Sequence, residues 1–227
     1  AAMTTEVDKE RLAREQIILR TVQEFQEGWL VNLGSGLPSY CVNYVPPDRG
    51  VIFHSENGIV GMGKMATAEE LDLHLVNALG QHVLLNPGAS IVDHADSFAL
   101  VRSGRLDVTV LGAYEVAENG DFANVSREPG KPGAGGGAMD MAANAKRVFV
   151  VMQHTTDDGT PRLVKSCKLP LTAPCVVKKV FTDLGVFDVN PGGFVIEEIA
   201  PGWTVEEVQA LSGATIRPAP GLREVRV

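Results

Sequence analysis

The chain has 227 residues, of which 44% are hydrophobic and 21% are charged, and it carries a formal net charge of −8. This apolar content supplies a sizeable core without disulfides, and the three cysteines form no Cys-x-x-Cys pair, which argues against a secreted disulfide scaffold and a zinc knuckle. The acidic charge argues against nucleic-acid binding, and no apolar run reaches the roughly twenty residues of a membrane span. The charged N-terminal segment is unlike a signal peptide, so we expect a cytoplasmic protein.

Apolar spacing predicts alternating helices and strands along most of the chain. Ile18, Val22 and Phe25 indicate a first helix over residues 8–27, which Gly28 ends. Further helices are expected over residues 39–45, 69–78, 94–102 and 138–145, with strands at 29–33, 51–53, 82–85, 106–111 and 147–152 between them. Short apolar strands between helices are typical of an α/β fold with an open, mostly parallel sheet that carries helices on both faces.

The pattern changes after about residue 159. Strand-like runs at 176–181, 185–189 and 193–199, separated by short turns, favour antiparallel edge strands near the C-terminus. Thr204 and Glu207 form the pattern of a capping box for a last helix over residues 204–211. No repeat or linker divides the chain, so we expect one domain over residues 3–227. The turn-rich segment 122–137 is long enough to be a functional loop.

Several well-known sites are missing from the sequence. There is no phosphate-binding loop, no dinucleotide-binding glycine motif, no His-Glu-x-x-His and no Gly-x-Ser-x-Gly. The five histidines include no i, i+4 pair that would bind a metal ion from one helix. We therefore expect no metal ion.

One acidic residue occupies a position suited to chemistry. Glu56 follows a short apolar strand, at the sheet edge where open α/β folds bind ligands. Asn57 and Gly58 tolerate positive φ and predict a sharp turn, which would hold Glu56 on a fixed backbone. By residue type alone, a solvated hairpin turn explains the same four residues.

Residues 53–61 resemble the glutamate signature of the class I CoA-transferases: an aromatic residue, His or Gln, Ser-Glu-Asn-Gly, two apolar residues, then Gly or Ala. Further stretches resemble the second half of that family in the same order, at residues 32–38, 87–90, 104–112, 120–124, 136–140 and 169–172. The similarity covers nearly the whole chain. It is most specific to the β subunit of succinyl-CoA:3-oxoacid or 3-oxoadipate CoA-transferases.

The resemblance implies a role for Glu56 as catalytic nucleophile. The carboxylate would attack an acyl-CoA, expected to be succinyl-CoA, and form a glutamyl-CoA thioester before CoA passes to a 3-oxoacid such as acetoacetate. Coenzyme A is then a substrate, and no cofactor is expected. Gly136 or Gly137, before a helix, would lie on the oxyanion side as a further catalytic group. A flexible loop that enters a helix remains the alternative for these glycines.

The resemblance also implies a substrate-binding set of Asn57, Gly34, Gly36 and Asn124. Purely structural turns remain the alternative for Gly34 and Gly36, and Asn57 would either position Glu56 or only shape its turn. The CoA-binding Gly-Gly-Phe loop of the family's other half has no counterpart in a matching setting. We therefore expect an α subunit of the same fold as partner, in an αβ or α2β2 heteromer, with acyl-CoA and small carboxylic acids as ligands.

Several alternatives stay open at this point. Ser35 and Val125 depart from the family's usual residues, and Val125 leaves the acceptor acid undecided among acetoacetate, 3-oxoadipate, acetate and butyrate. A sugar-phosphate isomerase or a ligand-sensing module on a related α/β fold is a more distant possibility, with Glu56 as a base or an inert turn residue. A subunit that only completes a partner's site is a third.

Overall fold

The computed structural model describes residues 9–131, 133 and 136–227. Residues 3–8, with which the expected domain begins, lie outside the described part of the chain, as does Gly135 in the glycine run before the predicted helix at 138. Four α-helices are described: α1 (Arg14–Val22), α2 (His94–Arg102), α3 (Ala138–Asn144) and α4 (Val205–Ala210). Two 3-10 helices, η1 (Leu37–Tyr44) and η2 (Pro47–Arg49), follow the first strand.

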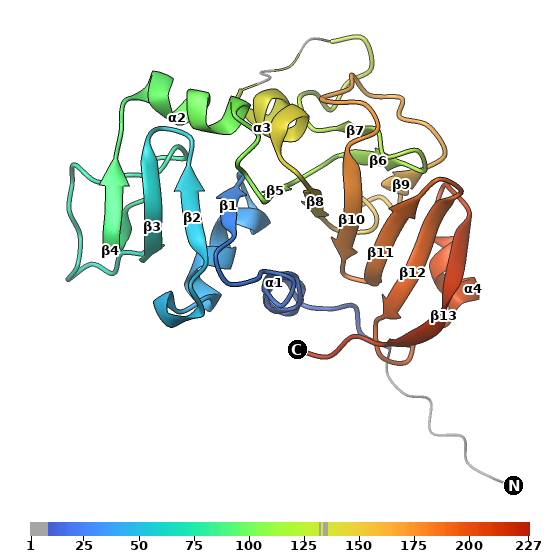
Figure 1. The fold of residues 1–227 in the computed structure, drawn as a ribbon. Coiled ribbons are helices and arrows are strands. Elements are labelled where there is room, and N and C mark those ends of the chain that lie inside the picture. Colours follow the sequence, from blue (N-terminus) through green and yellow to red (C-terminus); the bar gives the residue numbers. More distant parts are fainter. Residues whose placement is uncertain (1–8, 132, 134–135) are drawn as a thin grey trace, which may run out of the picture.

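Most of the strands belong to one large sheet (Figure 1). Its order is β13-β12-β11-β10-β8-β5-β1-β2-β3-β4. These strands are β1 (Leu30–Leu33), β2 (Ile52–Ser55), β3 (Ile59–Met65), β4 (Val83–Ile91), β5 (Val108–Leu111), β8 (Val148–Val151), β10 (Val177–Thr182), β11 (Gly185–Asn190), β12 (Gly193–Ile199) and β13 (Ile216–Glu224). A small second sheet, in the order β7-β6-β9, contains β6 (Glu115–Ala117), β7 (Phe122–Ala123) and β9 (Leu163–Val164).

The middle of the large sheet is parallel, as the short apolar strands predict. Strands β10, β8, β5, β1 and β2 run parallel to their neighbours, whereas β11 and β12 pair antiparallel towards one edge. The expected antiparallel strands near the C-terminus are thereby confirmed. Strands β3 and β4 add an antiparallel pair at the opposite edge. The carboxyl ends of β2, β1, β5 and β8 consequently lie in a row.

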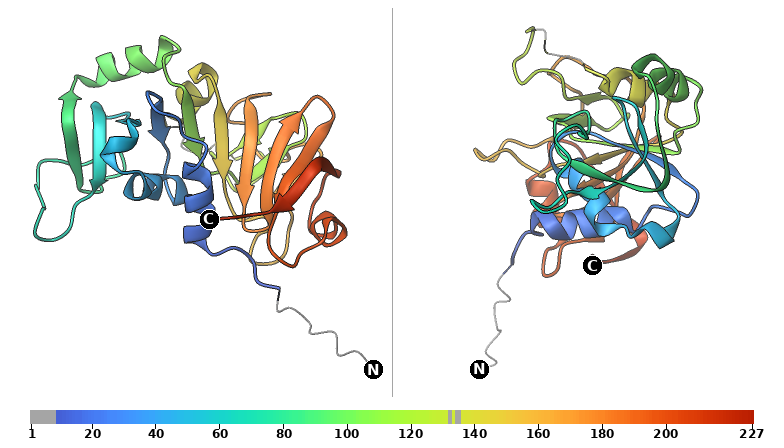
Figure 2. Two further views of the ribbon diagram at one scale, coloured as in Figure 1. Left: turned by 60° about the horizontal axis from the view of Figure 1, so that its bottom comes forward. Right: turned by 90° about the vertical axis from the view of Figure 1, so that its left-hand side faces the viewer.

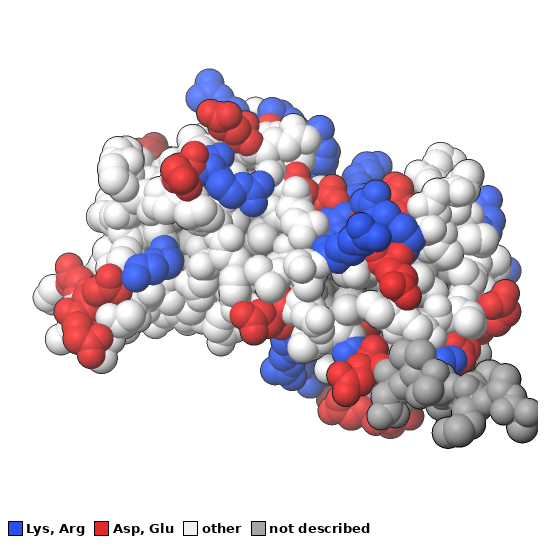
Figure 3. Space-filling model, turned by 90° about the horizontal axis from the view of Figure 1, so that it is seen from below, with Lys and Arg blue, Asp and Glu red and all other residues white. Residues whose placement is uncertain are grey.

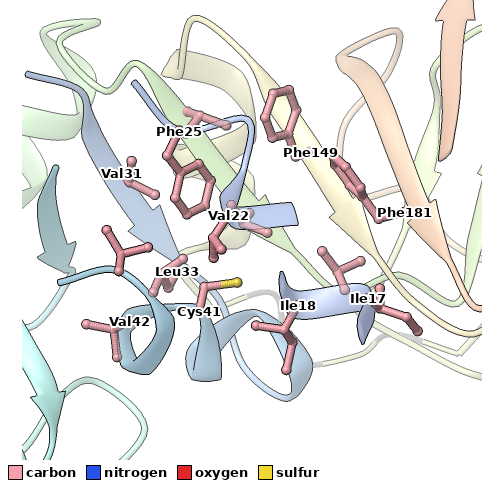
Figure 4. Packing of buried hydrophobic residues seen from close by; sticks show 14 of the residues in the cluster. Ile17, Ile18, Val22, Phe25, Val31, Leu33, Cys41, Val42, Phe149 and Phe181 are labelled. Atoms are coloured by element: carbon pink, nitrogen blue, oxygen red, sulfur yellow. The ribbon is translucent and has the colours of Figure 1, made fainter. Parts of the chain in front are cut away.

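Alternation along the central strands sends side chains to two different layers. Val31, Phe53, Val110 and Phe149 face α1 and η1, in a core that Figure 4 shows closing around Ile17, Ile18, Val22, Phe25 and Cys41. On the opposite face, Val148, Val150 and Val180 pack with Ala142 of α3 and Val208 of α4. Helices α2 and α3 lie side by side on that face (Figures 1 and 2). Both faces thus carry helices, and the α/β prediction is confirmed.

Two strands escaped prediction because of their glycines. In β3, a Cβ at Gly61 would lie 2.9 Å from the Cα of Ala89, and one at Gly63 would lie 2.9 Å from Oδ1 of Asn86. Both glycines permit close approach to β4 at places where the register of the pair shifts. Strand β13, at the far edge, contains Pro218, Pro220 and Gly221, which hide it from propensity-based prediction.

The predicted helix over residues 69–78 is wrong. The segment is a series of turns, closed by the N–H groups of Glu70, Leu75 and Gly80 bonding to carbonyls three residues earlier. Its leucines gave the helical spacing, but Leu73 is 73% exposed and Leu71 44% exposed, so no surface exists for a helix face to pack against. The predicted helix at 39–45 is a 3-10 helix beginning two residues earlier.

The other helices match their predictions. Helix α2 has the predicted bounds, α3 ends one residue early, and α1 is confined to the middle of the predicted 8–27 segment. The capping box is confirmed, since Thr204 Oγ1 accepts the N–H of Glu207 while Glu207 Oε2 accepts the N–H of Thr204. Within the described residues, no helix is long and apolar enough to cross a membrane. On the face shown in Figure 3, Lys and Arg side chains are interspersed with Asp and Glu.

Candidate active site

Glu56 occupies the tight turn that joins β2 to β3. The turn closes through the N–H of Gly58, which donates to the carbonyl of Ser55 at 3.0 Å, and Gly58 has a φ of 122°. A Cβ on Gly58 would lie 2.2 Å from the carbonyl oxygen of Val92, so this position admits only glycine. The backbone carrying Glu56 is therefore fixed by sequence, as the Ser-Glu-Asn-Gly pattern predicts.

The Glu56 side chain is half-buried and lines a cavity of about 230 Å³ at the carboxyl ends of the central strands. This cavity, here called the acyl pocket, brings together five of the seven predicted site residues: Glu56, Gly34, Asn124, Gly136 and Gly137. Leu79 from the 66–82 loop and Met141 from α3 supply apolar walls. The loop over residues 122–137 therefore contributes to the pocket through Asn124 and its two last glycines.

Two predicted residues lie elsewhere. Asn57 is exposed, and its Nδ2 donates to the carbonyl of Val76 at 2.8 Å, so it ties the Glu56 turn to the 66–82 loop without lining the pocket. Gly36 lines a second cavity next to the first. There it precedes η1 with a φ of 77°.

Gly137 is in direct contact with the Glu56 carboxylate. A Cβ on Gly137 would lie 2.2 Å from Oε2 and 2.7 Å from Cδ of Glu56, so no larger residue fits while the carboxylate keeps its place. Gly137 is the N-cap of α3, and its carbonyl accepts the N–H of Met141 at 3.0 Å. Gly136 has a different need for glycine, because its φ is 48° and nothing lies within 4 Å of an added Cβ. The two adjacent glycines thus serve separate geometric purposes.

Asn124 and Gly34 form the pocket wall between the strand ends. The Asn124 side chain donates through Nδ2 to the carbonyl of Gly112 at 3.1 Å and accepts the Thr172 hydroxyl at 2.6 Å. The N–H of Gly34 donates to the carbonyl of Val110 at 2.8 Å, and a Cβ there would meet Leu111 at 2.9 Å. Both residues are held by the protein itself and define the shape of the cavity.

Burial raises the pKa of Glu56 above its ordinary value. The nearby Asp140 carboxylate raises this pKa further, and His94 at the start of α2 acts in the opposite direction. Asp140 stands in the first turn of α3 and accepts a hydrogen bond from Arg102 Nε at 2.8 Å. A half-buried carboxylate with a raised pKa in a cavity is the environment expected of a catalytic group.

A row of buried polar side chains, which sequence reasoning did not predict, lies beside Glu56. Thr109, Asn32 and His54 stand in register on β5, β1 and β2. The Thr109 hydroxyl donates to Asn32 Oδ1 at 3.0 Å, and Asn32 Nδ2 lies 3.2 Å from His54 Nδ1. His54 Nε2 then lies 2.9 Å from the hydroxyl of Ser97 on α2.

This row joins β2 to α2 directly below the turn that holds Glu56. All four side chains are at most 2% exposed, and burial lowers the pKa of His54 to about 4, so His54 is neutral near pH 7. A neutral ring that accepts from Asn32 at Nδ1 donates to Ser97 from Nε2. Only the two-residue alternation of the strands could have indicated this, because the three strand positions lie far apart in sequence.

No group of three or more His, Cys, Asp or Glu side chains suited to a metal ion occurs among the described residues. The candidate site is therefore a carboxylate, glycine backbone and an apolar wall. Such a site can form and break a covalent bond to the carboxylate if the reacting group is held away from water.

Comparison with known proteins gives the family of the chain. A curated relative from Bacillus subtilis, named as the β subunit of a probable coenzyme A transferase, is 44% identical over 90% of this chain and 94% of its own length. A 3-oxoadipate CoA-transferase subunit from Acinetobacter baylyi is 43% identical over 91% of this chain and 95% of its own. The human mitochondrial succinyl-CoA:3-ketoacid coenzyme A transferase 2 is 40% identical over 96% of this chain, which spans 43% of that protein.

The fold comparison agrees. The crystal structure of an acyl-CoA transferase from Escherichia coli superposes with a TM-score of 0.74 at 19% identity, covering 97% of this chain and 44% of that one. The model of the family described as Coenzyme A transferase matches residues 14–211. The chain therefore belongs to the Coenzyme A transferase family.

Proposed function

We propose that this chain is the catalytic β subunit of a heteromeric CoA-transferase of the succinyl-CoA:3-oxoacid or 3-oxoadipate type, with Glu56 as the covalent nucleophile. The observation that carries the proposal is the half-buried Glu56 carboxylate, packed against Gly137 inside the acyl pocket. The family match over residues 14–211 replaces the isomerase and sensor alternatives. An intact carboxylate in a formed pocket also argues against a subunit that only completes a partner's site.

The proposed reaction has four steps that conserve acyl activation. A Glu56 carboxylate oxygen attacks the thioester carbonyl of the donor, the C–S bond breaks, and a mixed anhydride and CoA thiolate result. The thiolate attacks the Glu56 carbonyl, releasing the donor acid and leaving glutamyl-CoA. The acceptor carboxylate then attacks this thioester, and the released thiolate attacks the acceptor's carbonyl, which restores the Glu56 carboxylate.

The surroundings of Glu56 suit these steps. The attack requires the ionised carboxylate, whereas burial and Asp140 oppose ionisation, so the charged form is destabilised and reactive. Each tetrahedral intermediate carries an oxyanion, for which we propose backbone N–H groups at Gly136 or Gly137 as donors. Because Gly137 lies against the carboxylate, an oxyanion formed on Glu56 itself would develop beside this backbone.

The partner in this proposal is an α subunit. One relative is named as a β subunit and another as a single subunit of its transferase, and the human relative contains more than twice the length that this chain spans. We propose that the α subunit completes the CoA site over the acyl pocket. For the acceptor we propose a 3-oxoacid such as acetoacetate, with 3-oxoadipate as the main alternative and acetate or butyrate as others.

Borohydride trapping tests the covalent step. The complex with the α subunit is mixed with succinyl-CoA and reduced, and the tryptic peptide containing Glu56 is weighed. We expect Glu56 to appear as the alcohol that reduction of a thioester leaves, in wild type and in Glu69→Gln, which neutralises an exposed carboxylate outside the pocket. Glu56→Gln should give no reduced peptide. An unmodified wild-type peptide with an intact α subunit and several acyl-CoA donors would refute the proposal.

A further inference from the structure

A second cavity adjoins the acyl pocket on the side of β8. Its volume is about 340 Å³, and it shares Ser35, Gly112 and Asn124 with the acyl pocket. Glu56 follows β2, Ser35 and Gly112 lie just beyond the ends of β1 and β5, and Gln153 beyond β8 lines the second cavity. The two cavities therefore form one continuous groove along the row of strand ends, with Glu56 at one end.

The second cavity is basic. Arg14, Arg127 and Arg162 line it, and no Asp or Glu is among the described residues that do so. Arg14 comes from α1, Arg127 from the loop after β7, and Arg162 directly precedes β9. Three distant parts of the chain thus place guanidinium groups around one cavity.

Arg162 has an unmet hydrogen-bonding requirement. Its Nε is buried and has no hydrogen-bond partner within the described part of the chain, where it is the one buried side-chain nitrogen or oxygen in this condition. Its Nη1 makes one long contact of 3.5 Å with the carbonyl of Ala113. A buried donor without a partner costs stability, so an unsatisfied Nε facing a cavity calls for an acceptor.

The charge of Arg162 is also uncompensated. Burial and the neighbouring Arg127 lower the pKa of Arg162, against the weaker opposite effects of Asp157 and Asp183. Neither acid forms an ion pair with Arg162 among the described residues, because Asp183 is 2.9 Å from Arg11 and accepts the backbone N–H of His154. The Arg127 guanidinium stacks on the ring of Tyr114, with Cζ 4.9 Å from the ring centroid. Two cations thus approach each other without an anion between them.

We infer that Arg127 and Arg162 form an anion subsite that binds the remote carboxylate of a short dicarboxylic acyl group while its thioester end lies at Glu56. Guanidinium groups bind planar carboxylates through paired hydrogen bonds, and the groove connects the subsite to Glu56 through shared walls. This inference rests on the proposed function for the identity of the reacting end. It assigns the recognition of a second carboxylate to this chain, and to these two arginines.

Steady-state kinetics of the complex with the α subunit test the subsite. The quantity measured is the ratio of kcat/KM for succinyl-CoA to kcat/KM for acetyl-CoA, since both donors carry the same CoA. Loss of a hydrogen-bonded charge pair should lower this ratio about 10- to 100-fold in Arg127→Gln and in Arg162→Gln. Arg127 is exposed, so its variant should fold normally. Lys131→Gln removes a positive charge from the same loop outside the cavity and should leave the ratio within about threefold.

Calorimetric titration with succinate and butyrate separates this inference from the proposed function. These acids have the same carbon chain and differ in the second carboxylate, so succinate should bind wild type more tightly, and Arg127→Gln should remove the difference. This holds even if no acyl-CoA is a substrate. Equal binding of the two acids by wild type would overturn the inference. So would an equal loss with succinyl-CoA and acetyl-CoA in both variants, because the anion would then be a phosphate of CoA.

Discussion

A methyl group at position 137 tests how Glu56 is held in place. A Cβ there would lie 2.2 Å from Oε2 of Glu56, whereas ordinary van der Waals contact begins at 3.4 Å, so in Gly137→Ala the carboxylate oxygen must move by the difference, about 1.2 Å. A displacement of about 1 Å at a reacting group costs on the order of 100-fold in rate. We therefore expect kcat of the complex with the α subunit to fall by about two orders of magnitude.

Folding should hardly change in this variant. Gly137 has φ −76° and ψ −9°, which alanine adopts without strain. The matched control is Gly136→Ala, which meets no atom within 4 Å but places alanine at φ 48°. That control should lose about 1–2 kcal/mol of stability from backbone strain while the Glu56 carboxylate keeps its place. Thermal unfolding and kcat of both variants check the reasoning, and a Gly137→Ala complex with more than about a third of wild-type kcat would refute it.

Three further predictions concern charge and burial. Asp140→Asn removes a like charge that raises the pKa of Glu56, so the acid limb of the pH profile of kcat/KM should move to lower pH; an unmoved limb contradicts this. His54→Leu should lower the free energy of unfolding by about 1–3 kcal/mol because buried partners lose their hydrogen bonds, and His54→Gln should restore most of it. Since burial lowers the pKa of His54 to about 4, wild-type stability should fall as pH drops from about 6.5 towards 4, and denaturant titrations should show a weaker fall in His54→Leu. Glu198→Ala leaves the buried Arg20 guanidinium without its 2.6 Å partner and should cost about 3–5 kcal/mol, with kcat per folded complex unchanged; loss of kcat would connect this ion pair to the site.

Sequence reasoning located the central sheet because each parallel strand is a short apolar run with its own local signal. It failed at residues 69–78 because leucine spacing records a pattern without recording whether a packing surface exists, and Leu73 remains 73% exposed. It also missed β3, where Gly61 and Gly63 lower strand propensity but are required by the close approach of β4. In each failure a tertiary contact, or the lack of one, overrode local preference.

The same contrast applies to the site. Glu56 could be predicted because its strand, its turn glycine and its signature lie within nine consecutive residues. The contact between Gly137 and the carboxylate joins positions far apart in sequence, and only the resemblance to a family pointed to it. Asn57 lies next to Glu56 in sequence but bonds to Val76 outside the pocket, because adjacent residues in a turn project in different directions. Adjacency in sequence is therefore a poor guide to which groups share a pocket.

The strand order explains why the anion subsite has no sequence signal of its own. Arg127 and Arg162 lie 35 positions apart and belong to no motif, and each alone would be an ordinary surface or partly buried arginine. They meet because β1 and β5 lie between β2 and β8, which aligns the loops after these strands along one groove. In such a sheet the reacting group can be fixed by one turn while distant loops read the rest of the substrate. Changes in the loop carrying Arg127 can therefore alter the choice of acid without moving Glu56, which the ratio of succinyl-CoA to acetyl-CoA turnover measures directly.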